Sequence, residues 1–226
     1  MENELTLAEL AKRLPEAFSY EELCQLSDEQ QLTYQNLLNN LITVNTTKST
    51  TREKGEALED LVAYLLNISG DVFSVYKNVR TATNEIDEII KLNEKGRVLE
   101  RLGTISARFL SFLGECKNYD KKVGVTYIGK FYSLLLTTGN STGILFSFHG
   151  ISGNGWKDGQ GLVKKIYLQR ENDINRTSII DFSLKDFRAI AEGDNFFAII
   201  DRKLDALRYD TSIESFISHH PAEKNF

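Results

Sequence analysis

The chain is poor in the residues that hold small secreted domains and zinc sites together. Its 226 residues include two cysteines, two prolines and three histidines. Cys24 and Cys116 are too few for a disulfide framework, and they have no metal-ligand spacing. Three histidines leave little scope for a zinc site built from imidazoles. The sequence therefore excludes a disulfide scaffold and argues against a histidine-built metal centre.

Long hydrophobic runs are also missing, and none approaches the roughly 20 residues that a membrane-spanning helix needs. Hydrophobic residues make up 41% of the chain and charged residues 26%, with a mean hydropathy of −0.29, which is typical of a folded globular protein. The acidic, amphipathic start, MENELTLAELAKRLPEAF, has the features of neither a secretory signal nor a transit peptide. We therefore expect a cytoplasmic protein that does not contact a membrane.

The formal net charge of −5 is unevenly distributed along the chain. Residues 1–50 hold 3 basic and 8 acidic residues, whereas residues 116–170 hold 8 basic and 2 acidic residues. A positive block of this kind is either a solvated face or a surface that binds a polyanion. The charge distribution alone leaves both interpretations open.

The N-terminal part of the chain has helical patterns and then a polar stretch. Leucines recur at helical spacing over residues 5–43, which predicts two or three helices there. The stretch 45–51, NTTKSTT, has the composition of a linker. We predict a small helical N-terminal segment at residues 1–44, a linker at 45–51 and an α/β domain at 52–226.

Beyond the predicted linker, helix and strand patterns alternate. Thr50 and Glu53 have capping-box spacing ahead of an apolar helical stripe that Gly70 closes. Strands are predicted at 72–76, 85–92, 109–117, 143–148 and 178–184, and helices at 125–136, at 162–170 and twice after the last strand, while 98–108 has no assignment. This order predicts an α/β fold with a mixed central β-sheet flanked by helices.

Two acidic residues and a lysine lie on the predicted strands in an order that suits metal-assisted chemistry. Glu115 and Lys117 point to the same face of their predicted strand, while Cys116 points to the other. If Asp87 lies on the neighbouring strand, one patch of the sheet holds two carboxylates and an ammonium. Carboxylate oxygens are hard ligands that suit Mg²⁺, and a lysine beside the metal can orient an attacking water.

Glu59 joins this set because of its place on the predicted helix. At about 100° per residue it flanks the apolar stripe that begins at Leu58, whereas Glu56 and Asp60 turn towards solvent. A purely structural interpretation is open as well, because carboxylate–lysine pairs across neighbouring strands commonly stabilise sheets.

The segments LEDLV (58–62), EID (85–87) and GECKNY (114–119) resemble the catalytic domain of Mrr-like restriction endonucleases, which belong to the PD-(D/E)xK nuclease superfamily. The resemblance covers roughly residues 51–205 and implies a restriction-endonuclease-like fold. It implies that Asp87 and Glu115 bind Mg²⁺, that Lys117 serves the attacking water and that Glu59 supports the metal site. It also implies hydrolysis of DNA phosphodiester bonds, often in restriction or phage-defence systems.

The chain departs from the family pattern in two places. The segment 98–108 lengthens the separation between Asp87 and Glu115, and Lys130 and Tyr127 stand where the family commonly has a glutamine. Residues 1–50 match no DNA-reading motif, and their charge favours docking of a partner protein or of a second copy over direct DNA contact.

Basic residues after Lys117 are candidates for binding the DNA backbone, although a solvated helix face is the alternative for those in the helix at 162–170. These candidates are Lys121, Lys122, Lys130, Lys157, Lys164 and Lys165. The glycine-rich segment 150–161 lacks the spacing of a phosphate-binding P-loop, so it is either a loop that carries Trp156 and Lys157 to DNA or a connector.

The sequence thus predicts a Mg²⁺-dependent DNA endonuclease, with Mn²⁺ as a substitute, that acts on double-stranded DNA as a homodimer. An alternative is a nuclease-like module that binds DNA or a partner protein without cleaving. A third interpretation keeps the enzyme and changes the substrate to branched DNA or RNA.

Overall fold

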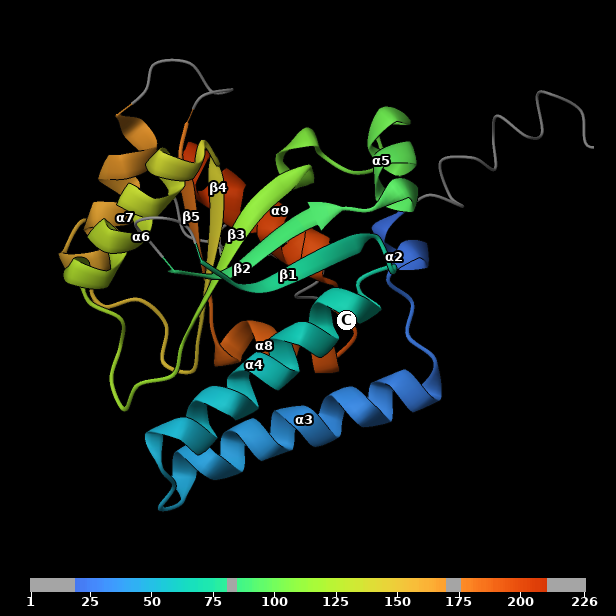
Figure 1. Cartoon of the computed structure of the whole chain (residues 1–226), viewed down its shortest axis with the longest axis horizontal. Helices are drawn as coiled ribbons and strands as arrows, with labels where there is room; N and C mark the ends of the chain where they lie inside the picture. The colour runs from blue at the N-terminus through green and yellow to red at the C-terminus, as the bar shows by residue number, and fades with distance from the viewer. Residues whose placement is uncertain (1–18, 81–84, 170–175, 211–226) are drawn as a thin grey trace, which may run out of the picture.

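The computed structural model of the chain describes residues 19–80, 85–169 and 176–210 (Figure 1). Within these residues the helices are α2 (Tyr20–Leu23), α3 (Asp28–Thr46), α4 (Thr51–Ile68), α5 (Glu94–Arg101), η1 (Ala107–Phe109), α6 (Val125–Thr138), α7 (Asp158–Leu168), α8 (Leu184–Ala191) and α9 (Phe196–Arg208). The strands are β1 (Phe73–Arg80), β2 (Glu85–Leu92), β3 (Ser111–Lys117), β4 (Thr142–Ser147) and β5 (Ser178–Phe182). The helices expected before residue 19, and residues 211–226, lie outside the described residues.

The five described strands form one mixed sheet in the order β1-β2-β3-β4-β5. β1, β2 and β3 are antiparallel neighbours, and β3, β4 and β5 are parallel neighbours. The parallel strands are joined through α6 and α7, as expected for parallel pairs that need a helical crossover. The predicted mixed sheet flanked by helices is confirmed.

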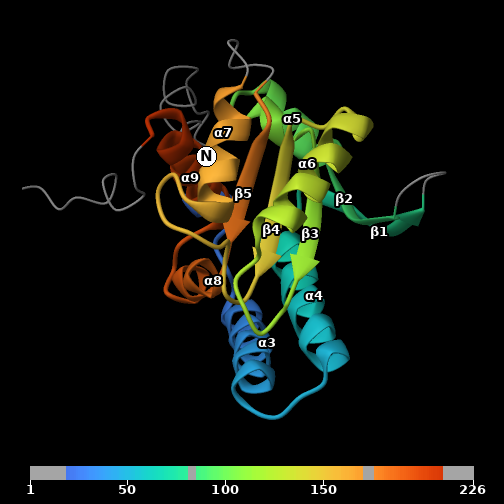
Figure 2. The same cartoon turned by 90° about the vertical axis from the view of Figure 1, so that its left-hand side faces the viewer.

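The sheet separates two hydrophobic clusters. One face carries Ile90, Phe112 and Ile144, which pack with apolar residues of α3, α4, α8 and α9. The opposite face carries Leu113 and Leu145, which pack with residues of α6 and α7. Figure 2 shows α6 and α7 in front of the strands, with α4 running below them. Because strand side chains alternate between these faces, the register of the sheet decides which polar residues share a face.

Two capped helices pack against each other at the bottom of Figure 1. The predicted capping box is confirmed: the Thr50 side chain accepts a hydrogen bond from the amide of Glu53, whose carboxylate accepts one from the amide of Thr50. α3 continues to Thr46, so residues 47–50 connect the two helices. The Tyr34 hydroxyl donates to the Phe187 carbonyl oxygen at 3.0 Å, which joins α3 to α8 inside the core. The division into a segment at 1–44 and a domain at 52–226 stays a prediction.

Two segments differ from the sequence-based expectation. Residues 98–108, which had no assignment, supply the end of α5 and the start of η1, and Phe109 of η1 is fully buried in a cluster of aromatic rings. α7 begins at Asp158 rather than at residue 162. The first turns of α7 contain glycines, which made this part of the helix resemble a loop in sequence. Only glycine fits at position 161, because a Cβ there would lie 2.0 Å from the Trp156 carbonyl oxygen.

No helix in the described part of the chain is long and apolar enough to cross a membrane.

We predict that Tyr34→Phe lowers the free energy of unfolding by about 1 kcal/mol, because it removes a buried hydrogen bond between α3 and α8. The measurement is urea-induced unfolding followed by circular dichroism. Tyr132→Phe is the matched control: its hydroxyl contacts Gln169 at an exposed position, and its removal changes stability by less than about 0.5 kcal/mol. If Tyr34→Phe unfolded at the same urea concentration as the wild type, the hydrogen bond would not stabilise the packing of α3 on the core.

Candidate active site

Three of the predicted site residues meet on one face of the sheet. Glu88 of β2 pairs with Gly114 of β3 in antiparallel register, so Asp87 and Glu115 follow as the next facing pair. Their side chains, together with that of Lys117, lie on the face opposite to that of Glu88. The juxtaposition inferred from the order of the sequence motifs is therefore present.

Lys117 joins the two carboxylates through its ammonium group. Its Nζ lies 3.0 Å from Oδ2 of Asp87 and 2.7 Å from Oε1 of Glu115. The side chains of Lys117 and Glu115 are 20% and 17% exposed, and that of Asp87 is 33% exposed. Partial burial strengthens the attraction between the Lys117 ammonium and the two carboxylates, because less water screens their charges. The remaining exposure leaves the cluster accessible to a substrate.

The charges in this cluster shift one another's protonation equilibria. Burial raises the pKa of Glu115, and the neighbouring Asp87 carboxylate adds to the increase, although Lys117 opposes it. Burial lowers the pKa of Lys117, but Glu115 and Asp87 outweigh it and hold this pKa above its ordinary value. Lys117 is accordingly a hydrogen-bond donor and a positive charge, which excludes it as a neutral base in this arrangement.

A cavity of about 510 Å³ opens beside the cluster between β3 and α6. Its lining includes Glu115, Lys117, Tyr119, Tyr127 and Lys130. The rings of Tyr119 and Tyr127 lie 5.2 Å apart, and Nζ of Lys130 lies 5.7 Å from the centre of the Tyr127 ring. Aromatic faces and a cation next to the carboxylates suit the sugar, bases and phosphates of a nucleic-acid strand.

The loop that carries Tyr119 is tied to the start of α4. Lys54, which is almost fully buried, forms an ion pair with Asp120. Asn118 donates from Nδ2 to the Lys54 carbonyl oxygen at 2.6 Å. These bonds fix the direction in which the chain leaves β3 immediately after Lys117.

Glu59 lies on the exposed side of α4, as do Glu56 and Asp60. Its charge is close enough to the opposite face of the sheet to help raise the pKa values of Glu88 and Cys116. The structure thus associates Glu59 with Glu88, and its predicted support of the metal site stays a prediction.

Glu88 is a residue of this region to which the sequence analysis assigned no role. Its side chain is 3% exposed, and both carboxylate oxygens are buried without a hydrogen-bond partner among the described residues. Lys77 lies 3.9 Å away, and a Cβ at Gly114 would lie 2.8 Å from Oε2 of Glu88. The glycine before Glu115 therefore provides the space for a buried carboxylate, and strand alternation is the signal that places Glu88 behind Asp87.

The donor set at the ion-pair cluster fits Mg²⁺. Mg²⁺ is commonly bound by one or two carboxylates, with water and substrate phosphate oxygens completing its octahedron, and Asp87 and Glu115 supply such a pair. The described residues contain no group of three or more acidic, histidine or cysteine side chains that could hold a metal ion. A metal here would therefore rest on two carboxylates and on oxygens from outside the protein.

The candidate DNA-binding lysines are spread over three segments. Lys130 lines the cavity beside the ion-pair cluster, and Lys121 and Lys122 are exposed in the loop after β3. Lys157 and Lys165 are exposed at the start and on the surface of α7. Lys164 is engaged elsewhere: its Nζ lies 2.5 Å from Oδ1 of Asp210 and 5.5 Å from the centre of the Trp156 ring.

The comparison with protein families agrees with this geometry. The mixed sheet presents Asp87 and the triplet Glu115-Cys116-Lys117 on the adjacent strands β2 and β3. Residues 50–177 match the model of the Mrr catalytic domain, described as a restriction endonuclease. Because the match spans more than half of the chain, the protein belongs to this restriction endonuclease family, and its fold is restriction-endonuclease-like. No curated protein and no solved structure matches the chain significantly.

We predict that Glu88→Gln stabilises the metal-free protein at pH 8 by an amount on the order of 2 kcal/mol. Burial raises the pKa of Glu88 from 4.5 to about 7, so the folded protein must ionise a buried group as the pH rises. The wild type therefore loses stability between about pH 4.5 and 7, whereas the Glu88→Gln variant has no carboxyl group to ionise there. Urea unfolding in EDTA at pH 5 and pH 8 measures this difference. A gain of the same size at both pH values would contradict the assignment to ionisation.

Proposed function

We propose that the chain is a metal-dependent DNA endonuclease that hydrolyses phosphodiester bonds in a restriction or phage-defence system. The observation that carries this proposal is the Asp87–Lys117–Glu115 cluster beside the cavity of β3 and α6. Membership of a restriction endonuclease family supports it. Cytoplasmic localisation is part of the proposal, because DNA is the substrate.

In this proposal Asp87 and Glu115 hold Mg²⁺, or Mn²⁺ in its place, and Glu59 supports the site from α4. When bound, the metal supplies positive charge that polarises a phosphoryl oxygen and lowers the pKa of an attacking water. Lys117 donates hydrogen bonds, so it orients the water and stabilises negative charge that develops at phosphorus. Its two carboxylate partners keep it protonated and fix its position before the substrate arrives.

Double-stranded DNA is the substrate that the surroundings of the site favour. Tyr119, Tyr127 and Lys130 line the cavity, and Lys121 and Lys122 are exposed in the adjacent loop. Lysines contribute affinity through phosphate contacts with little sequence information. Two strands need two cuts, so we propose that two copies act as a homodimer, with residues 1–44 as the docking segment for a partner protein.

A catalytically inactive binding module is the second candidate. The observation that favours it is the completeness of the ion pairs, since Lys117 contacts both carboxylates at 3.0 and 2.7 Å and such a pair also stabilises adjacent strands. A binding module would show salt-sensitive DNA affinity that does not depend on Mg²⁺ and would yield no products.

We predict that plasmid nicking requires Mg²⁺ or Mn²⁺ and falls by about 100-fold or more in Lys117→Met, which keeps the aliphatic stem and removes the charge. Asp87→Asn and Glu115→Gln abolish metal-dependent cutting because they remove the ligands. The measurement is the conversion of supercoiled plasmid over time, compared with EDTA.

Lys48→Met is the matched control, since Lys48 is exposed in the connection between α3 and α4. Equal cutting by wild type and Lys117→Met, or cutting that persists in EDTA, would contradict the site assignment. Binding without any cutting by the wild type would assign the second candidate function.

We predict that Lys130→Ala weakens DNA binding uniformly across sequences and reduces the slope of log affinity against log salt by about one. The double variant Lys121→Ala/Lys122→Ala reduces the slope by about two if both lysines contact phosphates. Fluorescence anisotropy of a labelled duplex in EDTA measures these slopes. Lys48→Ala leaves the slope unchanged, and an unchanged slope in Lys130→Ala would remove Lys130 from the DNA-binding surface.

A further inference from the structure

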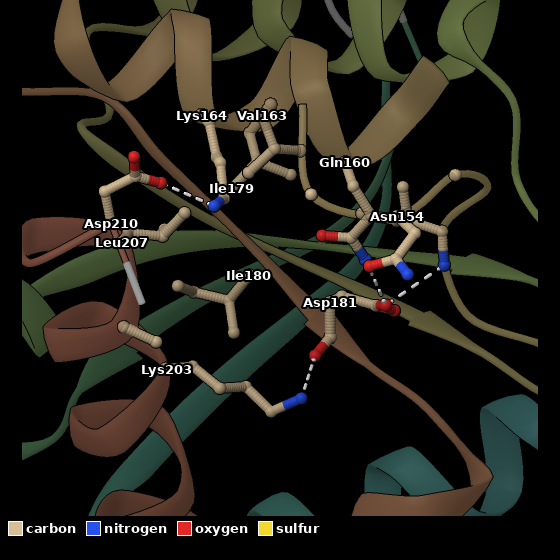
Figure 3. Close-up of a pocket in the computed structure, with 14 residues that line it drawn as sticks. Asn154, Gln160, Val163, Lys164, Ile179, Ile180, Asp181, Lys203, Leu207 and Asp210 are labelled. Atoms are coloured by element: carbon tan, nitrogen blue, oxygen red, sulfur yellow. Dashed lines mark hydrogen bonds and ion pairs between the residues drawn. The ribbon is translucent and has the colours of Figure 1, made fainter. Parts of the chain in front are cut away.

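A second cavity, of about 410 Å³, lies between the loop before α7, the strand β5 and the helix α9 (Figure 3). Its volume is within the range of small-ligand sites. Apolar walls come from Val163 of α7, Ile179 of β5 and Leu207 of α9. The amide side chains of Asn154 and Gln160 lie side by side at one end, and Asp181 lies next to them (Figure 3).

The loop wall of this cavity is held in one shape. Gly153 has a φ of +93°, and a Cβ there would lie 2.1 Å from the Lys157 carbonyl oxygen. The Ile151 amide donates to Oδ2 of Asp181 at 3.0 Å, which ties the loop to β5. The cavity is therefore preformed, which reduces the ordering cost of binding a ligand.

The two lysines of the cavity, Lys164 and Lys203, are already paired, which disfavours an anionic ligand. Nζ of Lys164 lies 2.5 Å from Oδ1 of Asp210 at one side. Lys203 donates to the Asp181 carbonyl oxygen at 2.5 Å and forms an ion pair with Asp186 at 2.8 Å. An anion such as phosphate would have to draw Lys164 or Lys203 away from its carboxylate partner, so the cavity disfavours anionic ligands.

Hydrogen-bonding capacity remains at the polar end. Nε2 of Gln160 lies 3.4 Å from Oδ2 of Asp181, and Oδ1 of Asp181 is buried without a hydrogen-bond partner among the described residues. An unpartnered buried carboxylate oxygen favours a ligand that brings an N–H donor. Asn and Gln amides read the amino and ring-nitrogen edge of adenine, and an Asp carboxylate accepts from the amino group of cytosine.

We propose that this cavity binds a nucleobase that carries an exocyclic amino group, through Asp181, Gln160 and Asn154. The apolar walls cover the flat faces of the base, and the polar end reads its amino edge. Asp181 lies on the face of the sheet that also holds the Asp87–Lys117–Glu115 cluster, since Asp181 is in register with Leu145 and Leu145 with Glu115. The base comes either from a bound DNA strand or from a free nucleoside.

The first experiment is calorimetric titration of the full chain in EDTA with cytidine and with uridine, which differ at the 4-amino group. Wild type binds cytidine about tenfold more tightly than uridine, because Asp181 accepts from the amino group. Asp181→Asn and Gln160→Leu lower the affinity for cytidine by about tenfold. Gln169→Leu is the matched control, since Gln169 follows α7 outside the cavity and keeps wild-type affinity.

The second experiment distinguishes the two sources of the base. A duplex with one unpaired 2-aminopurine, which carries an exocyclic amino group, is titrated in EDTA while its fluorescence is followed. An increase that Asp181→Asn abolishes and cytidine competes away assigns the cavity to a base of bound DNA. Cytidine binding with no change in the duplex assigns it to a free nucleoside.

Equal affinity for cytidine and uridine, equal affinity of wild type and Asp181→Asn, or no response to either nucleoside or duplex would overturn the proposal. These readouts need neither metal nor cleavage. A protein that binds cytidine as expected and cuts no DNA would disprove the endonuclease function and leave the nucleobase site standing.

Discussion

The geometry of the site depends on one ammonium group held between two carboxylates on adjacent strands. Asp87 and Glu115 face each other across β2 and β3, and without a cation between them their charges would repel. Lys117 lies 3.0 and 2.7 Å from the two groups, and its positive charge offsets the repulsion between them. The same arrangement prepares the site for chemistry, because it keeps two oxygen ligands and a hydrogen-bond donor together at the rim of a cavity.

The fold supports this cluster from both faces of the sheet. Gly114 leaves room for the buried carboxylate of Glu88 on the face that packs against α4. On the other face, α6 supplies Tyr127 and Lys130 to the cavity. The ion pair and the hydrogen bond between Lys54 and the loop after β3 hold this loop to the start of α4, where the chain passes from the sheet towards α6. The negative charge around β2 and β3 is balanced in part by the paired cations Lys77 and Lys117, and burial raises the pKa values of Glu88 and Glu115.

Much of the fold and part of the site could be predicted from sequence. Strand alternation placed Glu115 and Lys117 on one face, and the capping box of Thr50 and Glu53 located the start of α4. The start of α7 could not be predicted, because its glycines are required by close backbone packing and resemble a loop in composition. The proximity of Asp181 to the row of Glu115 and Leu145 depends on sheet register between segments distant in sequence. The burial of Glu88 likewise depends on what packs behind β2.

The most direct test of the account is the location of Mn²⁺ by anomalous diffraction in crystals of the wild-type protein. The account predicts one peak between the carboxylates of Asp87 and Glu115, next to Lys117 and at the cavity that Tyr127 and Lys130 line. A peak at Glu88 on the opposite face, away from Asp87 and Glu115, or no peak with the Lys117 ion pairs intact at saturating Mn²⁺, would contradict it. Either of those results would identify the cluster as a structural feature of the sheet.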